Sequence, residues 1–238
     1  MNSQEISGPV YDRESSHLWK AFGGALFLFV VNFILINVLL VDSFIYFVRG
    51  SWRPPLRDIP GSTVFVSWWM ILLPWMVISR SYSKWGKANR IFHPKTRLEK
   101  RSLIVLVVMG VVFLVFFFAI PHCNVLVETL RFHILLWGRL YGIMNTLLLY
   151  VYYVLEAMFV VWIADGFQTA GALLTKRIRI PWGGIGLALT WGAMHIYTKG
   201  FAMGWRAMAY GLFMGVLYEV SRKSVWPPVL AWLMNYLF

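Results

Sequence analysis

The chain has 238 residues, of which 59% are hydrophobic and 13% are charged, and its mean hydropathy is +0.65. Soluble domains carry about twice this charged fraction, so the composition excludes a soluble globular protein. Lys and Arg outnumber Asp and Glu by 22 to 10, which fits loops held at an anionic membrane leaflet, and we expect no nucleic acid as a partner. The sequence therefore predicts an all-α, multi-pass transmembrane helical bundle.

The N-terminal half contains three predicted membrane spans. Residues 1–20 lack the basic-then-apolar order of a cleaved signal peptide, so we expect a retained cytoplasmic tail. Residues 21–41 form the first span, which could extend to Val48, because about 20 residues cross the hydrocarbon. Further spans are predicted at 62–79, which contains a proline, and at 102–120.

The C-terminal half is predicted to complete the bundle. Residues 132–164 stay apolar for longer than an upright helix needs, which predicts either a strong tilt or a break near Gly142. A helix is expected from Pro181 through Thr198, since proline fits a first turn, and another from about Trp205 to Val220. The last segment, 225–238, is too short to cross alone and is expected to pack inside the bundle, for about seven spans in total.

The orientation is predicted from the basic residues, which stay on the cytoplasmic side of a membrane. Segment 80–101 holds eight Lys and Arg residues, so we expect this loop and the N-terminus to be cytoplasmic. Residues 21–238 are then a single integral membrane domain. Its expected partners are membrane lipids and other membrane protein subunits.

Ionisable groups inside a membrane are costly and therefore mark candidate functional sites. Glu156 lies among apolar and Tyr residues, so we expect it to be protonated, or paired and hydrogen-bonded; it suits a general acid or base, or a structural contact to a Tyr hydroxyl. His195 suits a general base, a metal ligand or a buried imidazole bonded to a backbone carbonyl. Arg139 and Asp165 are further candidates.

No metal site or cofactor is predicted. The histidines form no i, i+4 pair of the kind that binds a metal on a helix, and the single Cys123 excludes an all-Cys site. The aromatic fraction of 18% leaves open a pigment, quinone or lipid carrier, although aromatic residues also form belts at membrane interfaces.

A glycine pair predicts one close helix contact. Gly211 and Gly215 have the small-xxx-small spacing that lets two helix backbones approach each other. We expect the helices that carry Glu156, His195, Gly211 and Trp232 to pack together, with the first three spans at the periphery.

Several short stretches of the second half follow one another in a characteristic order: Glu156-Ala157-Met158-Phe159, then Trp191-x-x-x-His195, then Tyr210 to Tyr218-Glu219, then Ser224 to Trp232 with its Trp-Pro-Pro turn. In this order, residues 149–238 resemble the CPBP intramembrane proteases, which include the CAAX prenyl endopeptidases. The resemblance implies a helical membrane fold. It also implies a site in which paired glutamates and histidines activate water while an Asn helps to hold the oxyanion.

Most positions of that chemistry are changed in this chain. If Glu156 is the first glutamate of the motif EExxxR, then Ala157 replaces the second and Val161 replaces the arginine. The second histidine position falls on Trp232, and the asparagine of its HxxxN motif falls on Tyr236. Asn235 misses that position by one residue.

A second register of the same motif aligns Asp165-Gly166-Phe167 with its closing residues, and it replaces both glutamates by Val160 and Val161. Neither register keeps the glutamate pair. We therefore expect a catalytically inactive relative that acts as a binding or scaffold subunit of a membrane assembly. The alternatives are an active CPBP-type endopeptidase that uses Glu156 and His195, with polar support from Asp165 or Asn235, and the pigment, quinone or lipid carrier.

Overall fold

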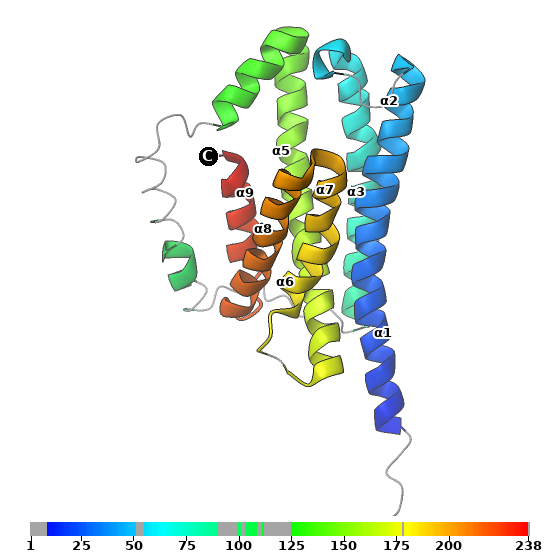
Figure 1. Cartoon of the computed structure of the whole chain (residues 1–238), viewed down its shortest axis with the longest axis vertical. Helices are drawn as coiled ribbons and strands as arrows, with labels where there is room; N and C mark the ends of the chain where they lie inside the picture. Colours follow the sequence, from blue (N-terminus) through cyan, green and yellow to red (C-terminus); the bar gives the residue numbers. More distant parts are fainter. Residues whose placement is uncertain are drawn as a thin grey trace, which may run out of the picture.

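The computed structural model describes residues 9–50, 55–89, 100, 103–108, 111, 125–177 and 179–237, and the regular elements of this part are helices (Figure 1). The all-α prediction is confirmed for these residues. The expected span at 102–120 lies largely outside them, as does the loop between Asn89 and Lys100.

The first helical rod has three parts. They are α1 (Pro9–Phe29), the π-helix η1 (Val30–Val41) and α2 (Asp42–Arg49), so helix already begins within the expected tail. Proline is tolerated at Pro9 because a first-turn N–H has no helical partner. Gly50 ends the rod with a φ of 69°, and its N–H donates to the Tyr46 carbonyl at 2.7 Å.

The π-helix η1 is much longer than the single π turns usual in proteins. Within this wider helix, the carbonyl oxygen of Asn32 accepts two hydrogen bonds from side chains. One comes from Nδ2 of Asn37, five residues later, at 2.8 Å, and the other from Nε1 of Trp75 at 3.3 Å. The π-helix therefore joins this rod to the next helix in the interior.

A short 3-10 turn, η2 (Leu56–Asp58), leads into α3 (Gly61–Ala88). The helix α3 continues through Pro74, as helices in membrane proteins often do, since neighbouring groups take over the freed backbone positions. It runs antiparallel to α1 (Figure 1).

The longest helix, α5 (Val125–Thr175), is broken at Gly138, where φ is 75° and ψ is 170°. The expected break near Gly142 is thus misplaced by four residues. Glycine is required at Gly142 for a different reason, because a Cβ there would lie 2.6 Å from the Cα of Ile134. Gly138 supplies the left-handed backbone, and Gly142 lets the segment before the break fold back closely.

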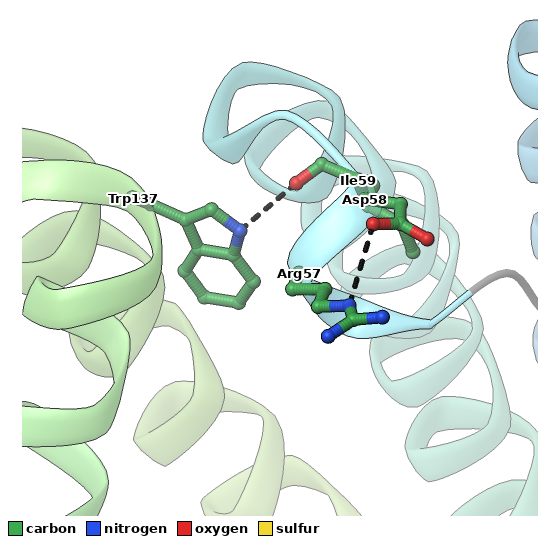
Figure 2. Close-up of polar contacts among 4 residues, drawn as sticks. All are labelled: Arg57, Asp58, Ile59 and Trp137. Carbon is green, nitrogen blue, oxygen red and sulfur yellow. Dashed lines mark hydrogen bonds and ion pairs between the residues drawn. The ribbon is translucent and has the colours of Figure 1, made fainter.

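Side chains around the break attach α5 to the start of α3. The indole Nε1 of Trp137 donates to the Ile59 carbonyl at 2.9 Å, next to the exposed Arg57–Asp58 ion pair at 3.7 Å (Figure 2). About two turns beyond the break, Nδ2 of Asn145 donates to the Gly61 carbonyl at 3.1 Å.

The remaining helices are short and lie beside α5. The chain rises through α6 (Trp182–Leu187), the π-helix η3 (Ala188–Gly192) and α7 (Ala193–Lys199), turns at Gly200, and returns as α8 (Phe201–Val220). The final helix, α9 (Trp226–Leu237), packs on α5 and α8, as expected for a segment too short to cross alone. The turn between α7 and α8 lies well below the upper end of α5 in the view of Figure 1.

Three helical stretches of the described part are long and apolar enough to cross a membrane: Ser15–Arg49, Gly61–Gly86 and Leu126–Thr175. They support an integral membrane protein, but the expectation of about seven spans is wrong for these residues. The segment from Pro181 onward is divided among short elements, and α8 carries Arg206 and Glu219, which lower its apolar character.

The helix α5 lies at the centre of the bundle and contacts α1, α3, α6 and α9. The first spans are therefore not peripheral, because Leu28 of α1 and Trp75 of α3 are fully buried against it. The rings of Tyr152 and Phe159 on α5 lie 4.9 Å and 5.0 Å from that of Trp75. Aromatic packing of this kind stabilises beyond the buried area alone.

Candidate functional site

Glu156 lies on the buried face of α5 and is 3% exposed. Its Oε1 accepts hydrogen bonds of 3.2 Å from the hydroxyl of Tyr152, one turn earlier, and from Nε1 of Trp191 on η3. Its Oε2 is buried and accepts no hydrogen bond within the described residues, while the indole of Trp232 lies near the carboxyl outside hydrogen-bond geometry. The expected contact to a Tyr hydroxyl is present, and the described part holds no ion pair to Glu156.

His195 is the next polar group of the site and lies on α7. Its Nδ1 is 2.9 Å from the Trp191 carbonyl, which can only accept, so Nδ1 carries the proton and Nε2 is left as an acceptor. The imidazole ring also packs on the indole of Trp191, with centroids 4.3 Å apart. Burial lowers the pKa of His195, which keeps the ring neutral near pH 7.

Glu156 and His195 line one cavity of about 420 Å³ between η1, α3, α5 and α7. The cavity has aromatic walls, and its other charged groups are Asp42 at the start of α2 and Lys199 at the end of α7. The uncharged residues of the lining include Phe33, Asn37, Trp68, Ile71, Tyr152, Tyr153, Trp191, Met194 and Thr198.

Of the positions at which the chain departs from the protease motifs, Ala157, Val161 and Trp232 are described and buried. Ala157 and Val161 lie in the interior beside Glu156, so neither register places a second carboxylate or an arginine next to it. Trp232 is fully buried and packs edge-on against Trp191, with ring centroids 4.7 Å apart. It lies beside the cavity without lining it.

Two other candidates belong to α9. Asn235 and Tyr236 are helical, but their side chains lie outside the described part of the structure. Arg139 is exposed at the break of α5, away from the interior where the sequence analysis placed a candidate.

Asp165 forms a separate buried polar contact. Its Oδ1 accepts a 2.9 Å hydrogen bond from the Tyr218 hydroxyl on α8. Asp165 lies nine residues after Glu156, which along an α-helix is about 14 Å, and it does not line the cavity. The site therefore does not bring the two carboxyl groups together.

Gly211 and Gly215 lie where α8 crosses α6 and η3. A Cβ at Gly215 would fall within the backbone of Gly184, and one at Gly211 would lie 3.1 Å from the Ala188 nitrogen. Backbone contact at this crossing fixes η3, and with it Trp191, against α5.

Sequence reasoning named Trp191 only as part of the Trp191-x-x-x-His195 stretch and missed its hydrogen bond to Glu156, and it missed Asp42 and Lys199 as members of the site. Asp42 and Lys199 both end an apolar segment, which was their only signal in the sequence. No group of three or more His, Cys, Asp or Glu residues able to hold a metal occurs among the residues that the structure describes.

Comparisons of the chain with models of protein families, with curated proteins and with solved structures find no match.

Proposed function

We propose that the protein is a non-catalytic integral membrane protein that binds a ligand in the cavity between Glu156 and His195, as a subunit of a membrane assembly. The observation that carries this proposal is a cavity of about 420 Å³ that reaches both residues, while buried apolar side chains occupy the neighbouring motif positions. Pockets of this size, with aromatic walls and a few polar groups, are typical of small-molecule sites.

The hydrogen bonds of the site argue against hydrolysis. Water attack on an amide needs a base with a free lone pair and donors that hold the oxyanion. The two hydrogen bonds from Tyr152 and Trp191 use the lone pairs of Oε1 of Glu156, and Oε2 is buried out of contact with bulk solvent. A base at this carboxyl would have to break these contacts first.

The resemblance to CPBP proteases remains part of the proposal. It is supported by the order of the helices and by the position of the two matching residues, Glu156 and His195, on one cavity. We propose that the chain keeps this arrangement and has lost the reaction, since groups that act as a catalytic unit are strongly non-additive.

The second candidate function is an intramembrane endopeptidase that uses Glu156 and His195. The specific observation in its favour is the same cavity, because Nε2 of His195 is an unprotonated acceptor on a residue of the lining.

A cleavage assay separates the two candidates. Wild type, Glu156→Gln and His195→Ala are compared on prenylated CAAX peptides and on unprenylated membrane-segment peptides. We expect no cleavage by any of the three proteins and altered co-purification of membrane partners with the variants. Cleavage by wild type that is lost in both variants would establish the endopeptidase.

A further inference from the structure

We propose that the ligand of the cavity is a monovalent organic cation, whose ammonium group lies between the Glu156 carboxylate and the surrounding aromatic rings. This inference rests on the proposed function, because it names the class of ligand that the same cavity takes.

Donor groups surround the carboxyl group of Glu156. The Tyr152 hydroxyl and the Trp191 indole both donate to Oε1 at 3.2 Å, and the indole N–H of Trp232 lies near the carboxyl. An indole N–H can only donate and a carboxylate only accepts, so the two indoles favour the anionic form.

Glu156 has no close counter-charge. The described residues place no Lys, Arg or His within ion-pair distance of it, and the Lys199 ammonium group acts on it only at longer range. A buried charge without a close partner is costly, so a cation that enters the cavity replaces lost solvation with a direct attraction. An anionic ligand would be repelled instead.

The cavity also has an aromatic wall. Ring faces carry negative potential and attract a cation within about 6 Å, most strongly where water is excluded. Trp68 and Tyr152 lie with their centroids 5.4 Å apart, and Tyr153 lies 5.6 Å from Tyr152, so several rings surround the same space. The aromatic residues of the lining are Phe33, Trp68, Tyr152, Tyr153 and Trp191.

The other charged groups of the lining agree with this choice. Asp42 adds a second carboxyl group, and His195 is neutral. Lys199 is the one cation among the lining residues, and it is exposed, so its ammonium group reaches water. We infer that Lys199 competes weakly with the ligand from the end of α7.

The test uses the full chain in detergent and isothermal titration calorimetry with choline and its neutral isostere, 3,3-dimethyl-1-butanol. The two probes have the same shape and differ in charge. We expect choline to bind wild type about tenfold or more tightly than the isostere, which corresponds to about 1.4 kcal/mol. Equal binding of both probes, or binding of neither, would overturn the inference.

Variants test whether the Glu156 carboxylate is the group that binds the ammonium group of choline. Glu156→Gln should weaken choline binding by about tenfold or more and leave the isostere unaffected, whereas Lys199→Met should strengthen choline binding. Glu128→Gln is the matched control, because Glu128 lies on the same helix but is exposed and paired with Arg131 at 3.5 Å. Choline binding that is the same in Glu156→Gln and Glu128→Gln would overturn the inference.

A separate variant keeps the test valid if Glu156→Gln fails to fold. Trp68→Leu removes one ring of the wall without touching a hydrogen bond to Glu156, and we expect it to weaken choline binding several-fold relative to the isostere. Failure of this inference is distinguishable from failure of the proposed function. If choline does not bind and no peptide is cleaved, only the inference of a cationic ligand is overturned. If the protein cleaves peptide and the cleavage depends on Glu156, the proposed non-catalytic function is overturned.

Discussion

The hydroxyl of Tyr218 on α8 donates a 2.9 Å hydrogen bond to Oδ1 of Asp165 on α5, and both side chains are almost completely buried. This contact joins two helices that are far apart in sequence, and it lies outside the cavity. The geometry gives Asp165 a contact between two helices and no place on the lining of the cavity, whereas the second motif register predicts polar support of catalysis.

Tyr218→Phe should destabilise the protein by about 1–3 kcal/mol, because it leaves a buried carboxyl without this donor. The measurement is thermal or denaturant unfolding in detergent. Tyr141→Phe is the matched control, since Tyr141 is exposed on the same bundle and should unfold like wild type. Equal stability of the two variants would show that the Asp165 contact contributes nothing.

The crossing of α8 with α6 predicts a graded series of glycine variants. A Cβ at Gly215 would overlap the backbone of Gly184, one at Gly211 would make a tight 3.1 Å contact, and one at Gly23 of α1 would meet nothing within 4 Å. Gly215→Ala should therefore cost about 1–3 kcal/mol, Gly211→Ala less, and Gly23→Ala nothing measurable.

Larger side chains sharpen the same series, and Gly211→Leu should lower the melting temperature in detergent clearly. An unchanged melting temperature for Gly211→Leu would mean that this surface faces lipid. A melting temperature of Gly23→Ala as low as that of Gly215→Ala would contradict the assigned contacts.

The break in α5 predicts a backbone effect at Gly138. Residues with a Cβ rarely adopt its φ of 75° with ψ of 170°, so Gly138→Ala should destabilise the protein by about 1–3 kcal/mol even though open space surrounds the position. Thermal unfolding measures the loss. A stability equal to that of wild type would place the break elsewhere.

Orientation is predicted from the ends of the helices. The start of α1, the end of α3 and the loop with Lys176 and Arg177 lie at one end of the bundle (Figure 1), which the positive-inside rule assigns to the cytoplasm. In a Cys123→Ser background, Ala88→Cys, exposed at the end of α3 and beyond the apolar stretch Gly61–Gly86, should resist an impermeant thiol reagent in intact cells and react after permeabilisation.

The control for orientation is Arg57→Cys, because Arg57 is exposed at the opposite end of the bundle. It should react in intact cells. The reverse pattern, with Ala88→Cys labelled and Arg57→Cys protected, would invert the orientation.

Long apolar helices were predictable from sequence because composition alone requires them. The helix start after Pro181 and the helix after Trp226 were also predictable, since proline marks first turns. The break in α5 was placed at Gly142 instead of Gly138 because a positive φ and a close approach both favour glycine. Only the packing of the folded chain distinguishes the two requirements.

The candidate site was predictable where its contacts are local. Tyr152 and Glu156 are one turn apart, so their hydrogen bond follows from helical spacing. The hydrogen bond from Trp191 to Glu156 depends on how η3 is positioned relative to α5. Asp42 lines the cavity because the path of η1 carries the chain to it. Contacts between helices distant in sequence leave no periodic signal.

The π-helix η1 has a consequence for insertions and deletions. A π-helix takes up more residues per turn than an α-helix, so the residues after it occupy a different angular position than an uninterrupted 3.6-residue period gives. Removing one residue from this segment would let a π turn close to an α turn, so α2 would keep about its present angular position. Removing one residue from an α-helical turn instead rotates the helix that follows by about 100°. The rod therefore tolerates a single deletion between Val30 and Val41 with Asp42 still on the cavity, and does not tolerate one within the first turn of α2.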